Sequence, residues 1–173
     1  MRSPSITDKV VDLRQLTQGA LAEMRALIFE LRPGALEEEG LLQALRKHAA
    51  AVQGREMLPV EVIADETSIP RLKPNAEESL YRITQEALHN VVKHAHAKRV
   101  EIKMALEDGY LLLQVSDDGD GFDMSQVPAG HMGLNTMRQR VAALGGEYQV
   151  SSKPGGGTSV SVRLPLVDQR LQS

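Results

Sequence analysis

The stretch RVEIKMALEDGYLLLQVSDDGDGFD, residues 99–123, decides the fold. Two apolar runs, 99–106 and 110–117, are joined by a short turn whose glycine suits a hairpin, so the pattern predicts two antiparallel strands. The second run enters DDGDGFD, which holds four carboxylates and two glycines in seven positions. The acids repel one another, and glycine permits backbone conformations closed to other residues. The segment indicates either a solvated loop or a site that a ligand completes.

The flanking sequence predicts helices and strands on both sides of this hairpin. Residues 76–95 form the strongest helical pattern, with apolar side chains at helical spacing. Glycine and proline residues near their ends help to delimit the other expected elements. These are a helix at 40–53, a strand at 58–66, a helix at 134–144 and a last hairpin at 147–153 and 158–166. Hairpin-linked strands mixed with helices predict an α+β domain, with an antiparallel-rich sheet covered by helices on one face.

Composition excludes several classes of function. The 173 residues carry a formal net charge of -3, which provides no general basic field for nucleic acid, so we expect no direct nucleic-acid binding. The chain has no cysteine, which excludes disulfides and thiolate metal sites. No apolar run approaches the roughly 18 residues that a membrane span needs. We expect a cytoplasmic location, with membrane attachment only through segments upstream of this chain.

The first segment carries a heptad stripe. Apolar or small residues recur at alternating spacings of four and three between Leu13 and Leu31, and Pro33-Gly34 ends the pattern. A lone helix cannot bury such a stripe. The segment is therefore either a helix packed on its own domain or one arm of an intermolecular bundle.

A polar face crosses the expected helix at 76–95. Glu86 and Asn90 are four residues apart and Lys93 follows three later, so a carboxylate, an amide and an ammonium project in one direction, with His94 beside them. Carboxylate and amide oxygens suit Mg²⁺, which keeps several waters and takes other ligands from phosphates. The alternative is the solvated polar face of an amphipathic helix.

Two glycine patterns follow. Asp117, Gly119 and Gly121 form a DxGxG spacing in which a carboxylate can accept a hydrogen bond from an exocyclic amino group while glycines admit a flat base. Gly130 and Gly133 precede a helix whose first amides can bind an anion. Each pattern alone is weak, because glycine-rich turns are mostly only turns. We expect Asp118, Asp120 and Asp123 to be solvated turn acids.

The order of these motifs resembles a known family. The run from Glu86 to His94, followed by DDGDGF, GHMGLNTMRQRV, LGG and PGGGTSVSVRLP, closely resembles the ATP-binding catalytic domain of bacterial two-component sensor histidine kinases. The resemblance covers about residues 34–166. It implies a two-layer α/β sandwich of the type shared by histidine kinases, gyrase-type ATPases and Hsp90. Residues 1–33 look like the second helix of a dimerisation hairpin, which favours the bundle arm and leaves 34–173 as the catalytic domain.

The resemblance implies ATP and Mg²⁺ as cofactors. Asn90 would be a Mg²⁺ ligand, and Glu86 would act as a catalytic residue through the metal, its water or proton transfer. Lys93 and His94 would face the phosphates.

On the base side, Asp117 would bind the adenine amino group, with Gly119 and Gly121 shaping the pocket. Thr158 would line the pocket floor. A short lid would close over the phosphates through the residues of GHMGL, namely Gly130, His131, Met132, Gly133 and Leu134.

One feature of the family is missing. In the class paired with LuxR-like regulators, the phosphoacceptor histidine is followed by an acidic residue, and none of the five histidines here fits this pattern. We therefore expect a kinase fragment that transfers the γ-phosphoryl of Mg-ATP to a histidine outside this chain, for relay to a response regulator with a DNA-binding output domain. The full-length protein would be a homodimer. The alternatives are an anti-sigma-type serine kinase and a non-catalytic ATP-binding interaction module.

Overall fold

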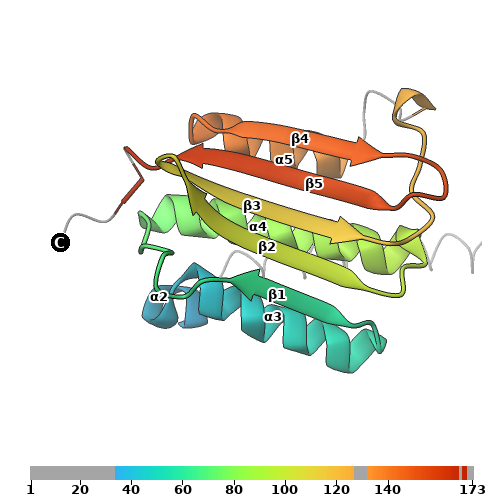
Figure 1. Ribbon diagram of the computed structural model, residues 1–173, viewed down its shortest axis with the longest axis horizontal. Coiled ribbons are helices and arrows are strands. Elements are labelled where there is room, and N and C mark those ends of the chain that lie inside the picture. Colours follow the sequence, from blue (N-terminus) through green and yellow to red (C-terminus); the bar gives the residue numbers. More distant parts are fainter. Residues whose placement is uncertain (1–33, 127–131, 168, 171–173) are drawn as a thin grey trace, which may run out of the picture. The chain divides into compact units, whose positions relative to one another are not determined.

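The computed structural model describes residues 34–126, 132–167 and 169–170. One layer is a five-stranded sheet of order β1-β2-β3-β5-β4 (Figure 1). Its strands are β1 (Val60–Ala64), β2 (Val100–Glu107), β3 (Tyr110–Asp117), β4 (Glu147–Ser152) and β5 (Thr158–Pro165). The heptad stripe at 13–31 and the lid residues Gly130 and His131 lie outside the described residues.

The sheet is mixed. β1 pairs in parallel with β2, whereas the other three pairings are antiparallel. Two of these, β2–β3 and β4–β5, are the hairpins that the sequence predicts. A parallel pair needs a long crossover, and here the crossover carries helix α4 (Pro74–Asn90). The register places Asp117, at the end of β3, between Val100 of β2 and Thr158 of β5.

The second layer consists of helices on one face of the sheet. Figure 1 shows α3 (Leu41–Glu56), α4 and α5 (Met132–Ala143) behind the strands, with α3 beside β1 and α5 behind β4 and β5. The strands alternate buried and more exposed residues, because successive side chains point to opposite faces. The core between the layers is aliphatic and includes Leu45, Leu80, Ile83, Leu88, Ile102, Leu113, Met137, Val141 and Leu164. This two-layer α+β architecture confirms the predicted fold class.

A short helix that the sequence pattern does not predict, α2 (Gly34–Glu39), precedes α3. The Arg71 guanidinium joins it to α4: Nη2 donates to the Glu37 carbonyl at 3.1 Å, and Nε donates to Glu77 Oε1 at 3.0 Å. Glu77 is only 3% exposed and also accepts a bond from the Leu72 amide at 3.0 Å. A buried carboxylate is costly unless it is paired and hydrogen-bonded, so this network fixes the approach of α2 to the start of α4.

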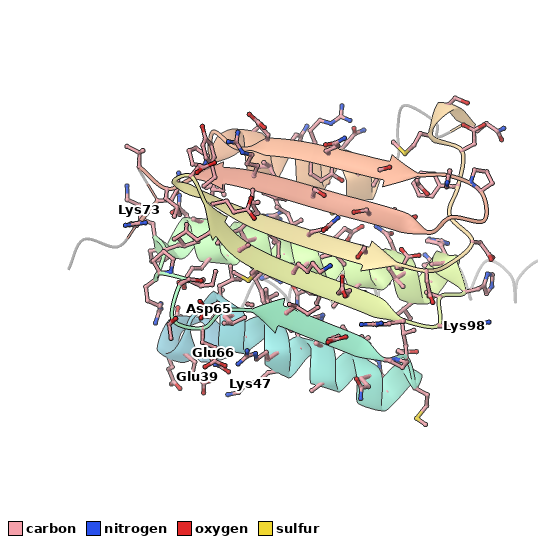
Figure 2. The ribbon with its side chains drawn as sticks, viewed as in Figure 1. Glu39, Lys47, Asp65, Glu66, Lys73 and Lys98 are labelled. Atoms are coloured by element: carbon pink, nitrogen blue, oxygen red, sulfur yellow. The ribbon has the colours of Figure 1, made fainter. Side chains whose placement is uncertain are left out.

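The outer surface near α2 and α3 carries ion pairs. Figure 2 labels Glu39 and Lys47, which form a pair at 2.6 Å, and Glu66, which pairs with Arg46. Exposed pairs of this kind contribute about 0–1 kcal/mol each, so they are not what holds the layers together. None of the helices in the described part of the chain is long and apolar enough to cross a membrane.

Candidate nucleotide-binding site

The last two turns of α4 carry the candidate metal and phosphate groups. Glu86 and Asn90, one turn apart on the same face, are both partly buried. Within the described residues, neither side chain forms a hydrogen bond or an ion pair. Gly133, near the start of α5, lies against Glu86: a Cβ there would come within 3.2 Å of Glu86 Cδ and closer still to Oε1. The structure thus brings Glu86 and Gly133 together from positions 47 residues apart in the sequence.

The helix changes character after Asn90. Residues Val91–Ala95 form one turn of π-helix, in which each amide bonds five residues back rather than four. Lys93 and His94 lie in this turn and are exposed. The expectation that Lys93 continues the face of Glu86 and Asn90 assumed regular α-helical spacing, whereas Lys93 lies in a wider turn. That Lys93 faces the phosphates stays a prediction.

Asp117 is a partly buried carboxylate at the end of the central strand β3. Its Oδ1 accepts a bond from the Gly119 amide at 2.8 Å, and the Thr158 amide also donates to the carboxylate. Burial raises the pKa of the Asp117 carboxyl; the neighbouring charge of Asp118 raises it further, and the two amide bonds oppose the rise. An acceptor held in a poorly hydrated place is suited to a ligand that brings a hydrogen-bond donor.

The glycines of the DDGDG loop permit close contact between backbones. A Cβ on Gly119 would lie 2.8 Å from both the carbonyl carbon and the Cβ of Ala95, in the π-turn. The Asp120 amide donates to the Ala95 carbonyl at 2.7 Å, and the Gly157 amide donates to the Gly119 carbonyl at 2.9 Å. Gly121 has a φ of +60°, and a Cβ there would lie 2.7 Å from the Gly157 carbonyl oxygen. These contacts fasten the end of the long helix, the loop and the β4–β5 turn to one another.

Of the three other acids of the loop, Asp118 and Asp120 are exposed, as predicted, and Asp123 is partly buried; each has a partner within the protein. Asp118 Oδ1 accepts bonds from the Lys98 and Arg99 amides at 2.8 and 2.9 Å, which lower the pKa of that carboxyl. Asp120 Oδ2 lies 2.8 Å from His96 Nδ1.

Asp123 accepts bonds from the Ser125 hydroxyl at 2.7 Å and the Ser125 amide at 2.9 Å, which lower the pKa of the Asp123 carboxyl. It thereby begins a single 3₁₀ turn, Met124–Gln126. The contacts of Asp118, Asp120 and Asp123 with neighbouring groups therefore help to hold the loop in its conformation.

The remaining candidates lie at the lid and in β5. Gly133 and Leu134 belong to the first turn of α5 and are partly buried, as is Thr158. Met132 begins α5, but its side chain is outside the described part. Thr158 Oγ1 lies 2.9 Å from Ser152 Oγ on β4.

Cavity size does not identify the site. A hollow of about 340 Å³ at the ends of β3, β4 and β5 is lined in part by Asp117, Gly157 and Thr158. A larger hollow of about 600 Å³ between α3 and β1 contains none of the candidate residues. The smaller hollow therefore agrees better with the sequence motifs.

The donor set suits a magnesium ion that arrives with a nucleotide. Among the described residues, no group of three or more His, Asp or Glu side chains is arranged to hold a metal by itself. One carboxylate and one amide oxygen, both unengaged, fit Mg²⁺ when phosphates and water complete the shell. They do not fit a closed structural zinc site, which needs four protein ligands.

Tyr148 is a feature that the sequence patterns do not reveal. Burial raises its pKa to about 12; the charge of Arg138 opposes this rise and the charge of Glu86 adds to it. Its hydroxyl is shielded from solvent and makes no hydrogen bond in the described part of the protein. An aromatic residue in a strand is ordinarily read as core, and only the three-dimensional structure places it near Glu86.

Residues 75–168, more than half of the chain, match the family described as histidine kinase-, DNA gyrase B- and HSP90-like ATPases. The chain belongs to this family. It is similar to sensor histidine kinase LiaS of Bacillus subtilis (strain 168), with 38% identity over 144 residues, 83% of this chain and 39% of LiaS. It is also similar to sensor protein VraS of Staphylococcus aureus (strain COL), with 30% identity over 165 residues, 94% of this chain and 46% of VraS.

A solved structure agrees with these sequence relatives. The histidine kinase domain of the blue-light activated histidine kinase EL346 from Erythrobacter litoralis superposes with a TM-score of 0.61 at 29% identity, covering 73% of this chain and 61% of that domain. The chain is thus a catalytic ATPase domain of the sensor histidine kinase type. It spans less than half the length of the curated relatives that it matches.

Proposed function

We propose that this chain binds Mg-ATP and transfers the γ-phosphoryl group to a histidine that lies outside it. The observation that carries the proposal is Asp117, a poorly hydrated acceptor at a strand end, in a domain of this ATPase family. In this proposal the Asp117 carboxylate accepts a hydrogen bond from the adenine amino group. Glu86 and Asn90 face the phosphates, and Lys93 and His94 approach them from the π-turn.

The chemistry asked of the side chains is mainly positioning and neutralisation of charge. A neutral imidazole nitrogen of the acceptor forms a bond to the γ-phosphorus as the bond to the bridging oxygen breaks, which yields phosphohistidine and ADP. The proton on the other imidazole nitrogen passes to the Glu86 carboxylate. Bound Mg²⁺ would neutralise the phosphate oxygens, with Asn90 as its protein ligand and Glu86 holding its water. The helix start at Gly133 and Leu134 would cover the phosphates, together with the lid residues outside the described part.

The domain division and the partners belong to the same proposal. We assign residues 1–33 to the second helix of a dimerisation hairpin and 34–173 to the catalytic domain. The likeness to sensor histidine kinase LiaS and sensor protein VraS supports a response regulator as the partner. We further propose that the intact protein is a homodimer and that the regulator carries a DNA-binding output domain.

The test is a binding titration of the Asp117→Asn variant with ATP. Asparagine keeps the size of the side chain but presents an amide where a charged acceptor is needed, so affinity should fall about tenfold or more, or roughly 1.4 kcal/mol. Burial raises the pKa of the Asp117 carboxyl, so folding favours its protonated form: the contribution to stability is present below about pH 4 and is lost as pH rises through the raised value and the carboxyl ionises. At neutral pH the ionised Asp117 carboxylate therefore does not stabilise the fold. The variant should therefore stay folded at neutral pH. Unchanged affinity in a folded variant removes Asp117 from the pocket.

A labelling experiment separates the reactions. The chain alone, incubated with γ-labelled ATP, should bind nucleotide and incorporate no acid-labile phosphate. Stoichiometric acid-labile label on one of its own histidines contradicts an external acceptor, and acid-stable label on serine or threonine favours an anti-sigma-type kinase. If a histidine-bearing helix pair from a longer form of the protein is supplied and no transfer occurs, the ATP-binding module becomes the better description.

A further inference from the structure

Tyr148 occupies an unusual position for a tyrosine hydroxyl. It is the second residue of β4 and pairs with Val162 of β5, whose side chain is buried beneath the helices. Tyr148 therefore points from the sheet into the helix layer. The other two tyrosines have evident partners: the Arg163 guanidinium lies 3.4 Å above the Tyr110 ring, and the Tyr81 ring meets His48 edge to face at 5.8 Å.

In the part of the chain that the structure describes, the Tyr148 hydroxyl is the exception among buried polar side-chain atoms, because the others have hydrogen-bond partners. It is buried, and no described group bonds to it. A buried hydroxyl without a partner is costly, and in native structures such groups are few and call for an explanation. Phenylalanine would fill the same space without this cost.

A matching unpaired acceptor lies in the same region. Two charges act on the Tyr148 hydroxyl, Arg138 on α5 and, more weakly, Glu86 on α4. Of these only the Glu86 carboxylate can accept a hydrogen bond, and it forms no hydrogen bond or ion pair within the described residues. Gly133 leaves room for the Glu86 carboxylate at the start of α5, and α5 packs over β4. A phenol is protonated at neutral pH and donates one hydrogen bond, whereas a carboxylate only accepts. The two unpaired groups are thus chemically complementary.

We propose that Tyr148 is a positioning residue for Glu86: when nucleotide binds, its hydroxyl donates a hydrogen bond to the Glu86 carboxylate, directly or through one water, and holds that carboxylate toward the phosphates. This inference rests on the proposed function, because it assumes that Glu86 faces Mg-ATP. It assigns the Tyr148 hydroxyl, which has no partner among the described residues, to a bond with the Glu86 carboxylate when nucleotide is bound.

The experiment compares Tyr148→Phe with Tyr110→Phe in the full chain. Both changes delete one hydroxyl, but the Tyr110 ring keeps its stacking with Arg163. The readouts are the thermal unfolding midpoint without nucleotide, and ATP affinity with and without Mg²⁺ by displacement of a fluorescent ATP analogue.

For Tyr148→Phe we expect the midpoint to rise by about 2–4 °C, because an unpaired buried group is removed. Affinity for Mg-ATP should fall about threefold to tenfold, while affinity for metal-free ATP stays the same. In a Glu86→Ala background, which removes the acceptor, the Tyr148→Phe change should no longer affect Mg-ATP affinity, since Tyr148 acts through Glu86. Tyr110→Phe should change none of these values.

Three results overturn the inference: unchanged Mg-ATP affinity in Tyr148→Phe, a lower midpoint showing that the hydroxyl is already bonded without nucleotide, or an undiminished effect in the Glu86→Ala background. If the unaltered chain binds no ATP, the proposed function itself fails. If it binds ATP and Tyr148→Phe binds Mg-ATP equally well, only the role of Tyr148 is lost.

Discussion

The Gly119→Ala variant tests whether the DDGDG loop is needed for the stability of the fold or for the shape of the nucleotide pocket. Gly119 is not among the glycines with positive φ, so alanine can adopt its backbone conformation. The obstacle is space alone. The new Cβ would lie 2.8 Å from the carbonyl carbon and the Cβ of Ala95, and the nearest obstacle, the Ala95 carbonyl oxygen, is backbone that cannot rotate aside as a side chain does.

The cost follows from the contacts that must open. To make room, the loop has to leave the π-turn, which breaks the bond from the Asp120 amide to the Ala95 carbonyl and strains the bond from the Gly157 amide to the Gly119 carbonyl. Each bond contributes about 0.5–1.5 kcal/mol, and overpacking costs about 1–3 kcal/mol. We expect a loss of about 2–5 kcal/mol in the free energy of unfolding, a large part of the roughly 5–15 kcal/mol typical of a domain.

The assay is urea unfolding monitored by circular dichroism, with Gly54→Ala as the matched control. Gly54 lies within α3 and a Cβ there meets nothing within 4 Å, so the same chemical change should stabilise by about 0.5–1 kcal/mol. If Gly119→Ala unfolds within about 0.5 kcal/mol of the unaltered chain, the steric argument is wrong. A stable variant that has lost ATP affinity would instead show that Gly119 is required for the base.

Three further changes test the site and its supporting loop. In Gly133→Ala the Cβ meets the mobile end of Glu86, so the thermal midpoint should change by less than about 3 °C while Mg-ATP affinity falls; a large loss of stability would show that the helix start is rigidly packed. Asn90→Ala deletes an amide oxygen and should weaken Mg-ATP more than metal-free ATP, and equal losses would contradict a metal ligand there. The pKa of Asp118 is lowered by amide bonds, so its contribution to stability is present above about pH 4 and is lost as pH falls through the lowered value. Asp118→Asn should therefore destabilise the domain at pH 7, and this effect should diminish as pH falls below about 4; an effect that does not change with pH would exclude the carboxylate charge as the cause.

Much of the fold could be predicted because its signals are local. The hairpin of β2 and β3 is marked by two apolar runs and an Asp-Gly turn, and the structure places the strands at Val100–Glu107 and Tyr110–Asp117. The helix expected at 76–95 is present as α4 and its π-turn. The spacing of apolar residues indicates which face of a segment is buried, and in these segments the buried face determines whether a helix or a strand forms.

What the sequence did not reveal depends on distant partners. The parallel pairing of β1 with β2 is set by the packing of α4 across the sheet, which no pattern within β1 records. Asp118 looks like any loop acid until the Lys98 and Arg99 amides are seen beside it. Tyr148 reads as core, and its relation to Glu86 arises only when β4, α4 and α5 meet.

The π-turn at Val91–Ala95 makes this segment tolerant of one change in length. A π-turn holds one residue more than an α-helical turn, so it behaves as an insertion carried inside a helix. Deleting a single residue here would convert the turn to an α-helical one, and the residues beyond it would keep approximately their present phase around the helix axis. The carbonyl at the end of the turn could then still accept the bond that the Asp120 amide now donates to Ala95. A relative that is one residue shorter in this turn should therefore keep the loop that follows, and an alignment should place its gap within the turn.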